Sequence, residues 1–461
     1  MKIFRNNIVF IFITLVTLSI FSGCFDKDKK EDKAPTAKIF VIADTHLMAP
    51  SLLVKDGTAF QTYLTGDRKL LEESKVILDE TINLILSEKP DLVLIPGDLT
   101  KDGAKVSHEM MAAALQKVVD SGIKVLVVPG NHDINNPHAI SYDGDTETHV
   151  DHITPDEFKQ IYANFGYKNA KVVDENSLSY VAEPIKGLVI IAMDSCKYDT
   201  NVADGKPKTE GSFSIEKLNW IYDQAAKANS DGKLIFGMMH HALTEHYTSQ
   251  STLFSEYVIK DWDSLDNEFA TRGMKAVFTG HYHANDVVKI GQGESSIFDI
   301  MTGSTVTYPN PYRVVSLTEG KTLTIATKYV RNVSHANISS TFEEYSENFL
   351  DTGLNIVVPM MLQAPPYSLD STTAASLAPP IVAALKAHYV GDESGVPAEL
   401  NPTMTGLQQQ ADALKASGDS GLIMQGMMLE QIIQVINSIF NDLPSKDNNL
   451  QIDLTTGEVT E

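Results

Sequence analysis

The stretch KVLVVPGNHD, Lys124 to Asp133, changes character halfway along. Its first half, Val125 to Val128, is a continuous apolar run, the composition expected of a strand buried on both faces. Its second half places Asn131, His132 and Asp133 in consecutive positions directly after a proline and a glycine. Such a run is either a polar turn or part of a metal site, and the rest of the chain is needed to choose between the two.

Apolar runs of the same kind recur along the chain. Six of them predict buried strands: Lys38 to Ala43, Asp91 to Pro96, Lys124 to Pro129, Leu188 to Met193, Lys233 to Met239 and Ala276 to Thr279. Apolar residues at helical spacing predict helices over Arg68 to Glu88, Ser107 to Asp120 and Ser214 to Ala228. This alternation predicts an α/β fold with helices flanking the sheets. Three later runs predict antiparallel strands: Ser296 to Met301, Tyr312 to Leu317 and Thr322 to Lys328.

Most of the predicted strands lead into polar residues that bind metals well. These residues are Asp44, His46, Asp98, Asn131, His132, Asp133, His240, His241, His281 and His283. Because the carboxyl ends of strands in open α/β sheets meet at one edge, we expect these side chains to form one cluster. A set of oxygen and nitrogen ligands suits Mn, Fe or Zn better than a soft metal.

The order of these blocks resembles the calcineurin-like metallophosphoesterase family, whose pattern is D-x-H, G-D, G-N-H-D/E, a His, then G-H-x-H. This chain has DTH at 44 to 46, GD at 97 to 98, GNHD at 130 to 133, His240 and GHYH at 280 to 283. Each block alone is weak, but five in order, each after a predicted strand, are specific. The resemblance covers roughly residues 38 to 330 and implies a sandwich of two mixed β-sheets flanked by helices.

The resemblance also implies a role for each matching residue. One metal ion is expected on Asp44, His46 and His283. A second is expected on Asn131, His240 and His281, and Asp98 is expected to bridge the two ions. Two ions about 3.5 to 4 Å apart can deprotonate a shared water and direct it at phosphorus. The metals themselves remain open between Mn, Fe and Zn.

Neighbours of the ligands are assigned other roles. The family pattern gives His132 contact with the phosphate and with the departing alkoxide. His240 is taken as the ligand because it comes first in its pair, which leaves His241 as a supporting or substrate-binding residue. Asp133 either fixes the loop or is an Asx-type turn residue. The glycines at 97, 130 and 280 are expected to let the chain turn sharply beside the metals.

The amino-acid sequence of the second block, at residues 97 to 103, bears on the substrate class. GDLTKDG, 97 to 103, departs from the GDxxDRG of protein phosphatases and leaves the usual orienting carboxylate for His132 without an assigned residue. Purple acid phosphatases use a Tyr iron ligand, whereas the first block here holds His46. The segments 97 to 115 and 127 to 137 resemble a bacterial branch related to class III cyclic-nucleotide phosphodiesterases. We therefore expect a small phosphodiester as substrate, with a cyclic nucleotide as one candidate.

Two alternatives stay open: a phosphomonoesterase or nucleotidase of the same superfamily, and a non-catalytic metal-binding lipoprotein whose C-terminal helices bind a partner. Candidate substrate contacts are His108, Asn135, Tyr308 and Arg313, because an Arg can fork to a phosphate. A packing or surface role competes with each of these four assignments. Cys196, as a lone thiol, is more typical of a small buried residue.

The first 24 residues predict an export signal. Lys2 and Arg5 precede the apolar run Ile8 to Phe21, which leads to Ser-Gly-Cys ending at Cys24. This resembles a bacterial lipoprotein signal, in which Cys24 is lipidated; an uncleaved membrane anchor is the alternative. Residues 25 to 36 are polar and predict a tether. The protein is thus expected to be anchored by lipid in a bacterial cell envelope, facing the periplasm or the exterior.

The composition limits the partners. A formal net charge of -23 disfavours nucleic-acid binding, and an anionic substrate needs metal ions or a local cluster of donors. We assign the phosphoesterase domain to residues 37 to 340 and a helical C-terminal domain to residues 346 to 445. The Met-rich and Ile-rich stripe in 421 to 443 would cap the site, form a dimer contact or pack internally. Residues 446 to 461 are expected to be a loose acidic tail.

Overall fold

The computed structural model describes residues 34–365, 367–441 and 446–461. The signal predicted over residues 1–24, its Cys24 and most of the tether therefore lie outside the described residues. Among the described helices, none is both long and apolar enough to cross a bilayer.

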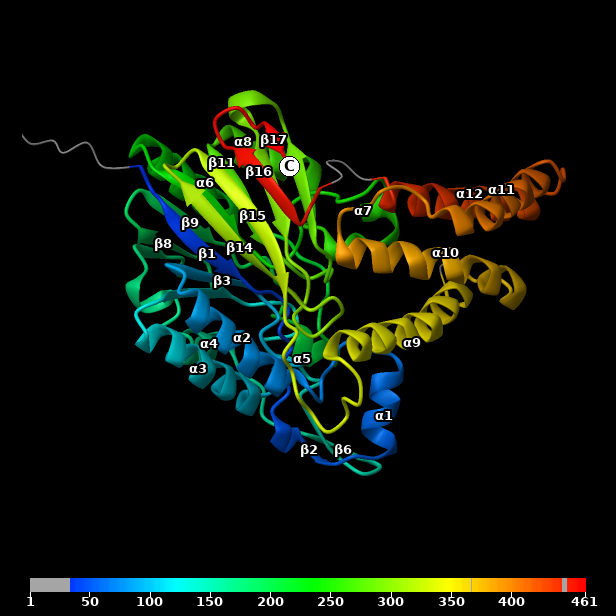
Figure 1. The fold of residues 1–461 in the computed structure, drawn as a ribbon, viewed down its shortest axis with the longest axis horizontal. Helices are drawn as coiled ribbons and strands as arrows, with labels where there is room; N and C mark the ends of the chain where they lie inside the picture. The colour runs from blue at the N-terminus through cyan, green and yellow to red at the C-terminus, as the bar shows by residue number, and fades with distance from the viewer. Residues whose placement is uncertain (1–33, 366, 442–445) are drawn as a thin grey trace, which may run out of the picture. The chain divides into compact units, whose positions relative to one another are not determined.

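Two seven-stranded mixed sheets form the centre of the fold, which confirms the predicted sandwich (Figure 1). The first sheet contains, in spatial order, β17 (Val459–Thr460), β16 (Asn449–Asp453), β15 (Thr322–Tyr329), β14 (Pro311–Thr318), β1 (Ala37–Val41), β3 (Leu92–Pro96) and β4 (Lys124–Val128). The second contains β12 (Asp286–Ile290), β13 (Ile297–Met301), β11 (Met274–Thr279), β10 (Leu234–Met238), β9 (Leu188–Ala192), β8 (Tyr180–Ile185) and β7 (Val172–Val173).

The strands that lead into the polar motifs are parallel neighbours. β1, β3 and β4 run parallel in the first sheet, and β9, β10, β11 and β13 run parallel in the second. Of the three late runs, β14 and β15 are antiparallel as predicted, whereas β13 lies in the other sheet between a parallel β11 and an antiparallel β12. Parallel pairing brings the carboxyl ends of these strands to a common edge.

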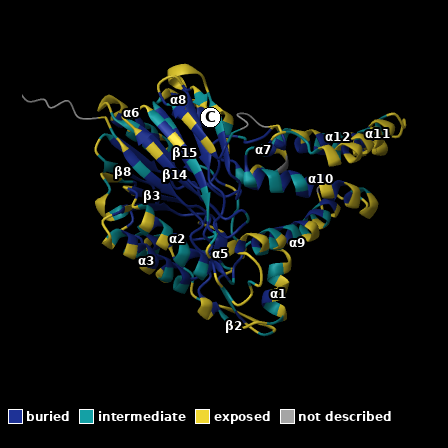
Figure 2. Cartoon of the chain, viewed as in Figure 1, coloured by how far each residue is buried: buried dark blue, intermediate teal, exposed yellow. Residues whose placement is uncertain are grey.

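Side chains alternate between the two faces of each strand and so feed two separate cores. Ile39 and Val41 of β1 join Phe236 and Phe278 of the second sheet in an apolar layer between the sheets. Phe40 points the other way, into a core with α2 (Ser74–Glu88) and α3 (Lys105–Asp120). The outer face of the second sheet is covered by α6 (Ile215–Ser230) and α8 (Trp262–Thr271). Strands β3, β9 and β13 are consequently buried along their whole length, whereas β15 and β16 of the first sheet alternate buried with partly or fully exposed residues (Figure 2).

Smaller elements surround this frame. A three-stranded sheet consists of β2 (Leu53–Lys55), β5 (Ile140–Asp143) and β6 (Thr146–His149). The short helices are α1 (Thr58–Thr65), α4 (Pro155–Ile161), α5 (Asn201–Asp204) and α7 (Gln250–Leu253), with 3-10 turns η1 (Pro50–Leu52), η2 (Tyr167–Asn169), η3 (Ser255–Tyr257), η4 (Gly293–Ser295) and η5 (Ala398–Leu400).

Four helices make up the C-terminal helical region: α9 (Phe342–Gln363), α10 (Ser371–Val390), α11 (Asn401–Lys415) and α12 (Ser420–Ile439). Within residues 34–461 they belong to the same compact unit as the sheets. Their shared core also takes in Tyr247, Tyr282 and Met301 from the phosphoesterase part. On α12 the second half of the predicted stripe is buried, but Met424 and Met427 are 70% and 60% exposed.

The prediction of a loose acidic tail is wrong. Residues 449–453 form β16, which pairs antiparallel with β15, and β17 pairs with β16 in turn. Leu450, Ile452 and Leu454 alternate with polar residues, and all three are buried against the layer between the sheets. Asn449, Gln451 and Asp453 occupy the other face of the strand, so the polar residues of this segment do not prevent pairing.

Replacing Ile452 by alanine is expected to lower the free energy of unfolding by about 2–5 kcal/mol, because a fully buried aliphatic side chain is lost. The measurement is urea denaturation followed by circular dichroism. Gln451→Ala, on the exposed face of the same strand, is the matched control and should change stability by less than about 0.5 kcal/mol. Equal stabilities for the two variants would show that β16 does not pack as described.

Candidate metal centre

All seven predicted metal ligands lie on loops that directly follow strands. Asp44 and His46 come after β1, Asp98 after β3 and Asn131 after β4, all from the first sheet. His240 follows β10, and His281 and His283 follow β11, from the second sheet. The centre therefore forms where the strand ends of the two sheets meet.

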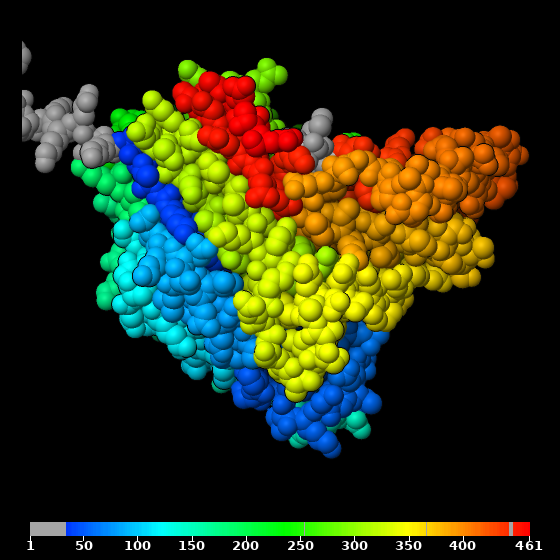
Figure 3. Space-filling model, viewed as in Figure 1, coloured from blue at the N-terminus to red at the C-terminus, as the bar shows by residue number. Residues whose placement is uncertain are grey.

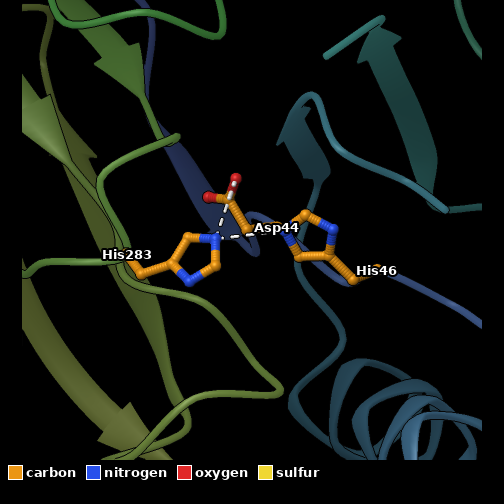
Figure 4. Close-up of side chains that lie close together, drawn as sticks. All are labelled: Asp44, His46 and His283. Atoms are coloured by element: carbon orange, nitrogen blue, oxygen red, sulfur yellow. Dashed lines mark hydrogen bonds and ion pairs between the residues drawn. The ribbon is translucent and has the colours of Figure 1, made fainter. Parts of the chain in front are cut away.

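The first group consists of Asp44, His46 and His283, whose side chains point toward one another in Figure 4. The Nε2 atoms of His46 and His283 are 3.0 Å apart, and Nε2 of His283 is 3.9 Å from Oδ1 of Asp44. All three ligand atoms lie within 4.8 Å of one another. This matches the set that the family resemblance implied for one metal ion.

The second group consists of Asp98, His240 and His281, again within 4.8 Å of one another. Asn131 joins it, since its Oδ1 lies 2.9 Å from Nε2 of His240. Asp98 connects the two groups: its Oδ2 lies 3.5 Å from Nε2 of His46 and 3.4 Å from Nε2 of His240. That is the placement expected of a bridging carboxylate.

The chemistry of this donor set fits two metal ions. Asp44 and Asp98 are 0% and 1% exposed, and buried charges in proteins are paired or coordinate metals. Burial raises the pKa of Asp44 to about 8, and the Asp98 carboxylate adds to this against the opposing His240. Nδ1 of His46 is buried without a hydrogen-bond partner among the described residues. Divalent cations between these groups would offset the free-energy cost of burying two carboxylates.

Hydrogen bonds to residues outside the ligand set orient three of the imidazole ligands. His240 uses Nδ1 to donate to the Pro96 carbonyl at 3.0 Å, and His281 uses Nε2 to donate to the Glu256 carbonyl at 3.1 Å. Nδ1 of His283 lies 3.1 Å from Oγ1 of Thr307. In each ring the other nitrogen is left for the centre, the arrangement that metal-binding histidines usually have.

The backbone at the centre is held in sparsely populated conformations. Positive φ angles, 36° to 74°, occur at five ligands: Asp44, His46, Asp98, His281 and His283. Left-handed conformations of residues other than glycine are costly and cluster at functional sites. Gly130 permits the close approach, because a Cβ there would lie 2.1 Å from Oδ1 of Asp98. The geometric role predicted for the glycines is thus visible here in the structure.

His132 lies beside the metal ligands, and its side chain is 23% exposed. Its Nε2 is 4.0 Å from Oδ2 of Asp98, and its Nδ1 is 2.9 Å from Oδ1 of Asp102. Although burial lowers the pKa of His132, the carboxylates of Asp98 and Asp102 outweigh it and raise the pKa. This leaves Nε2 as the ring atom that lies nearer to Asp98 and the candidate metal centre.

Asp102 is the orienting carboxylate that sequence reasoning did not find. It belongs to GDLTKDG, four positions after Asp98, where the protein phosphatase pattern has it three positions after. Burial tends to raise the pKa of Asp102, but the buried Lys101 ammonium and the His132 ring hold it below its usual range. The only available sequence signal was an aspartate displaced by one residue.

Asp102→Asn is expected to lower kcat about 10- to 100-fold, the usual cost of removing a partner that orients a site residue. It should also lower the pKa of His132, since one of the groups raising that pKa is lost. A general acid is active when protonated, so the basic limb of the pH profile of kcat should move to lower pH. Asp120→Asn, on the exposed end of α3, is the control and should leave the profile unchanged. An unaltered basic limb in Asp102→Asn would contradict the pairing.

Asp133 ties the second and third blocks together. Its Oδ2 accepts hydrogen bonds from the backbone N–H of Leu99 at 3.1 Å and of Gly130 at 2.8 Å, and its Oδ1 accepts from Thr100. Burial raises the pKa of Asp133 to about 6, with the Asp98 carboxylate adding to the shift. The side chain therefore fixes the loop across two strands rather than making a local turn alone.

Arg313 does not reach the centre. It lies in β14, is completely buried, and its guanidinium donates to the carbonyls of Met301 and Asp447 and to Thr327. These contacts hold β14, β13 and the C-terminal segment together. The predicted phosphate contact is corrected, because the guanidinium is fully engaged inside the protein.

His241 is also enclosed. Its Nδ1 lies 2.8 Å from Oγ of Ser195, and its Nε2 donates to the Thr209 carbonyl at 2.8 Å. Both ring nitrogens are in use and the side chain is buried, so the predicted substrate contact of His241 is corrected. The ring instead packs against that of His281, with the two ring centroids 4.6 Å apart. Cys196 is buried, as predicted, with its thiol directed at the Pro129 carbonyl.

Of the other three candidate substrate contacts, one residue is buried and two are half-buried. His108 is buried and contacts Tyr162 and the Asp133 carbonyl. Tyr308 packs, half-buried, against the core of the C-terminal helices. Asn135 is half-buried in a left-handed conformation, φ 49°, on the loop that follows the third block. Of these three, only Asn135 lies on a loop that carries a metal ligand.

The fold and the two linked ligand groups define a metal-dependent phosphoesterase sandwich. The family model of calcineurin-like phosphoesterases matches residues 37–285, more than half of the chain, and the chain belongs to this family.

Two solved structures are similar at low identity. One is a dimetal phosphatase from Danio rerio, with 12% identity, TM-score 0.46, and coverage of 64% of this chain and 96% of that one. The other is a purple acid phosphatase from yellow lupin, Lupinus luteus, with 11% identity, TM-score 0.43, and coverage of 65% and 52%. No curated protein matches the chain significantly.

Proposed function

We propose that this phosphoesterase hydrolyses a small phosphodiester, with a cyclic nucleotide as one candidate, in the manner of the bacterial branch related to class III cyclic-nucleotide phosphodiesterases. The observation that carries the proposal is the placement of His132. Its Nε2 is 4.0 Å from Oδ2 of Asp98, the carboxylate that would bridge the two ions, and its Nδ1 is 2.9 Å from Oδ1 of Asp102. A diester with an alkoxide leaving group needs such a proton donor.

The protein groups divide the work between binding and proton transfer. When bound, two metal ions would lower the pKa of water and neutralise charge on the phosphoryl oxygens. The seven ligands Asp44, His46, Asp98, Asn131, His240, His281 and His283 would hold these ions. His132 would carry a proton at Nε2 and deliver it to the departing oxygen, while Asp102 accepts the hydrogen bond from Nδ1 and stabilises the protonated ring. Asp133 would maintain the spacing between Asp98 and the loop of His132.

A turnover panel tests the proposal. Manganese-loaded protein is assayed with 3',5'- and 2',3'-cyclic nucleotides, glycerophosphodiesters and simple phosphomonoesters. Hydrolysis of one diester class with a higher kcat/KM than any monoester is the expected result. A strong monoester preference would replace the proposal by a phosphomonoesterase or nucleotidase. Two bound metals without turnover of any ester would instead favour the non-catalytic lipoprotein.

We also propose that the protein is a lipoprotein of the bacterial cell envelope. The support is the sequence of residues 1–24, which ends in Ser-Gly-Cys. Bacteria that express the protein and grow with an alkyne-tagged fatty acid should label the chain, and Cys24→Ser should abolish the label. Labelling that persists in Cys24→Ser would contradict lipidation at this residue.

A further inference from the structure

One loop carries a candidate ligand for each of the two metal ions. It consists of residues 280 to 285, between β11 and β12, and is called the ligand loop below. His283 of this loop belongs to the first ligand group, and His281 belongs to the second. A displacement of this single loop would therefore disturb both metal positions at once.

Tyr282 lies between the two histidines and packs into the core of the C-terminal helices, where it is 5% exposed. Its hydroxyl lies 2.7 Å from the hydroxyl of Tyr247. Its ring centroid is 5.1 Å from that of His388 and 6.4 Å from that of Tyr389, and both of these residues lie in the last turn of α10. Because a buried aromatic ring contributes a large apolar contact, the middle of the ligand loop is held against the end of α10.

The end of the ligand loop is joined to the backbone of the same helix end. Asn285 is completely buried, and its Nδ2 donates to the Tyr389 carbonyl at 3.1 Å. Gly391 directly follows α10 with φ 77°, and a Cβ there would lie 2.5 Å from the carbonyl oxygen of Asn285. Only a residue without a side chain lets the two backbones approach each other this closely.

The end of α10 is itself attached to the sandwich, toward which α10 runs back from the outer part of the helical region (Figure 1). Nδ2 of Asn448 donates to the Val390 carbonyl at 2.9 Å, and Oδ1 of Asp447 accepts from the backbone N–H of Val287 at 2.9 Å. Figure 3 shows the orange surface of the helical region directly beside the red surface of this C-terminal segment. The turn that contacts the ligand loop therefore has a fixed position.

We propose that residues 388 to 391, at the end of α10, position the ligand loop and thereby set the affinity of the centre for its metal ions. The inference rests on the metal centre of the proposed function, but not on which ester is hydrolysed. These residues are not ligands and act through His281 and His283. Partners that orient metal ligands from outside typically change metal affinity by about 10- to 100-fold. The helical region would then be a structural part of the metal centre.

Binding of Mn²⁺ to the metal-free full chain, measured by calorimetry, tests the proposal without requiring turnover. Gly391→Ala should weaken the Kd of both ions by about 10- to 100-fold, because the new Cβ displaces the Asn285 carbonyl and the ligand loop with it. Asn285→Ala, which removes the bond to the Tyr389 carbonyl, should change the Kd in the same direction. The spin-coupled paramagnetic resonance signal of two neighbouring Mn²⁺ ions should decrease in both variants.

Gly418→Ala is the matched control. Gly418 also has a positive φ, 76°, but apart from its chain neighbours no atom of the described residues lies within 4 Å of a Cβ placed there. The variant therefore has the same kind of backbone strain without displacing the ligand loop, and both Kd values should stay within about twofold of the parent. Ile452→Ala, which loses a buried side chain of β16, controls for a general loss of stability and should bind Mn²⁺ as the parent does.

Kd values in Gly391→Ala within about twofold of the parent would overturn the proposal, and so would an equal weakening in Gly418→Ala or Ile452→Ala. If circular dichroism shows that Gly391→Ala does not fold, Asn285→Ala decides by the same criterion. A parent that binds both ions, with affinity lost in these variants, but hydrolyses no ester would sustain the role of α10 and remove the phosphodiesterase. A parent that binds no Mn²⁺ would remove both.

Discussion

Replacing Asp98 by alanine is expected to reduce turnover by more than about 100-fold, since loss of even an indirect partner of a metal ligand costs about 10- to 100-fold. Oδ2 of Asp98 lies 3.5 Å from His46 and 3.4 Å from His240, so a single carboxylate connects the two ligand groups. Without it neither group keeps its full ligand set. The bound metal, measured by elemental analysis after dialysis, should therefore fall below two ions per chain.

Asp79→Ala provides the comparison, because Asp79 is a partly exposed carboxylate of α2 that pairs with Lys75 four residues earlier. Its metal content and turnover should equal those of the parent. Asp98→Ala protein that keeps both ions, or hydrolyses the ester at the parental rate, would exclude the bridged two-metal centre.

The second large effect is expected at His132. His132→Gln should lower kcat for a diester with an alkoxide leaving group about 10²- to 10⁴-fold, the range of general acid catalysis. With a p-nitrophenolate leaving group the loss should be much smaller, because that group departs without a proton. Metal content should not change, since the seven ligands remain. The measurement is kcat across a series of diesters whose leaving groups differ in pKa.

His149→Gln, an exposed histidine on β6, serves as the control and should leave all rates as they are. An equal loss for every leaving group would argue against proton donation. A loss of metal in His132→Gln would instead place His132 among the ligands, a reading suggested by its proximity to His46 and Asp98.

The sequence alone was enough to predict the sandwich and to name the residues that the structure brings together as candidate metal ligands. Strand ends are local features: the apolar run before Asn131 predicts β4, and the glycine and polar residues after it mark its carboxyl end. Because parallel strands align those ends, a one-dimensional order of motifs becomes a three-dimensional cluster. The loop conformations at Asp44 and His281 then follow from what the centre requires of the backbone.

The hydrogen-bond partners of buried polar groups could not be predicted from the sequence. Asp102 reaches His132 across 30 residues, and Arg313 reaches the Asp447 carbonyl across 134. Burial forces each such group to find a partner, but which partner it finds depends on how distant segments pack. The phosphate role predicted for Arg313 failed for this reason.

What the sequence by itself determined is the order of strands and of ligands, since both are set by local periodicity and covalent sequence. What only the tertiary structure decided is the surroundings of these residues: the orienting Asp102, the enclosed His241, and the tail that becomes β16. Those features depend on desolvation and on contacts between segments far apart in the chain. Candidate metal ligands can thus be predicted from motifs, while the partners that surround them are fixed by packing.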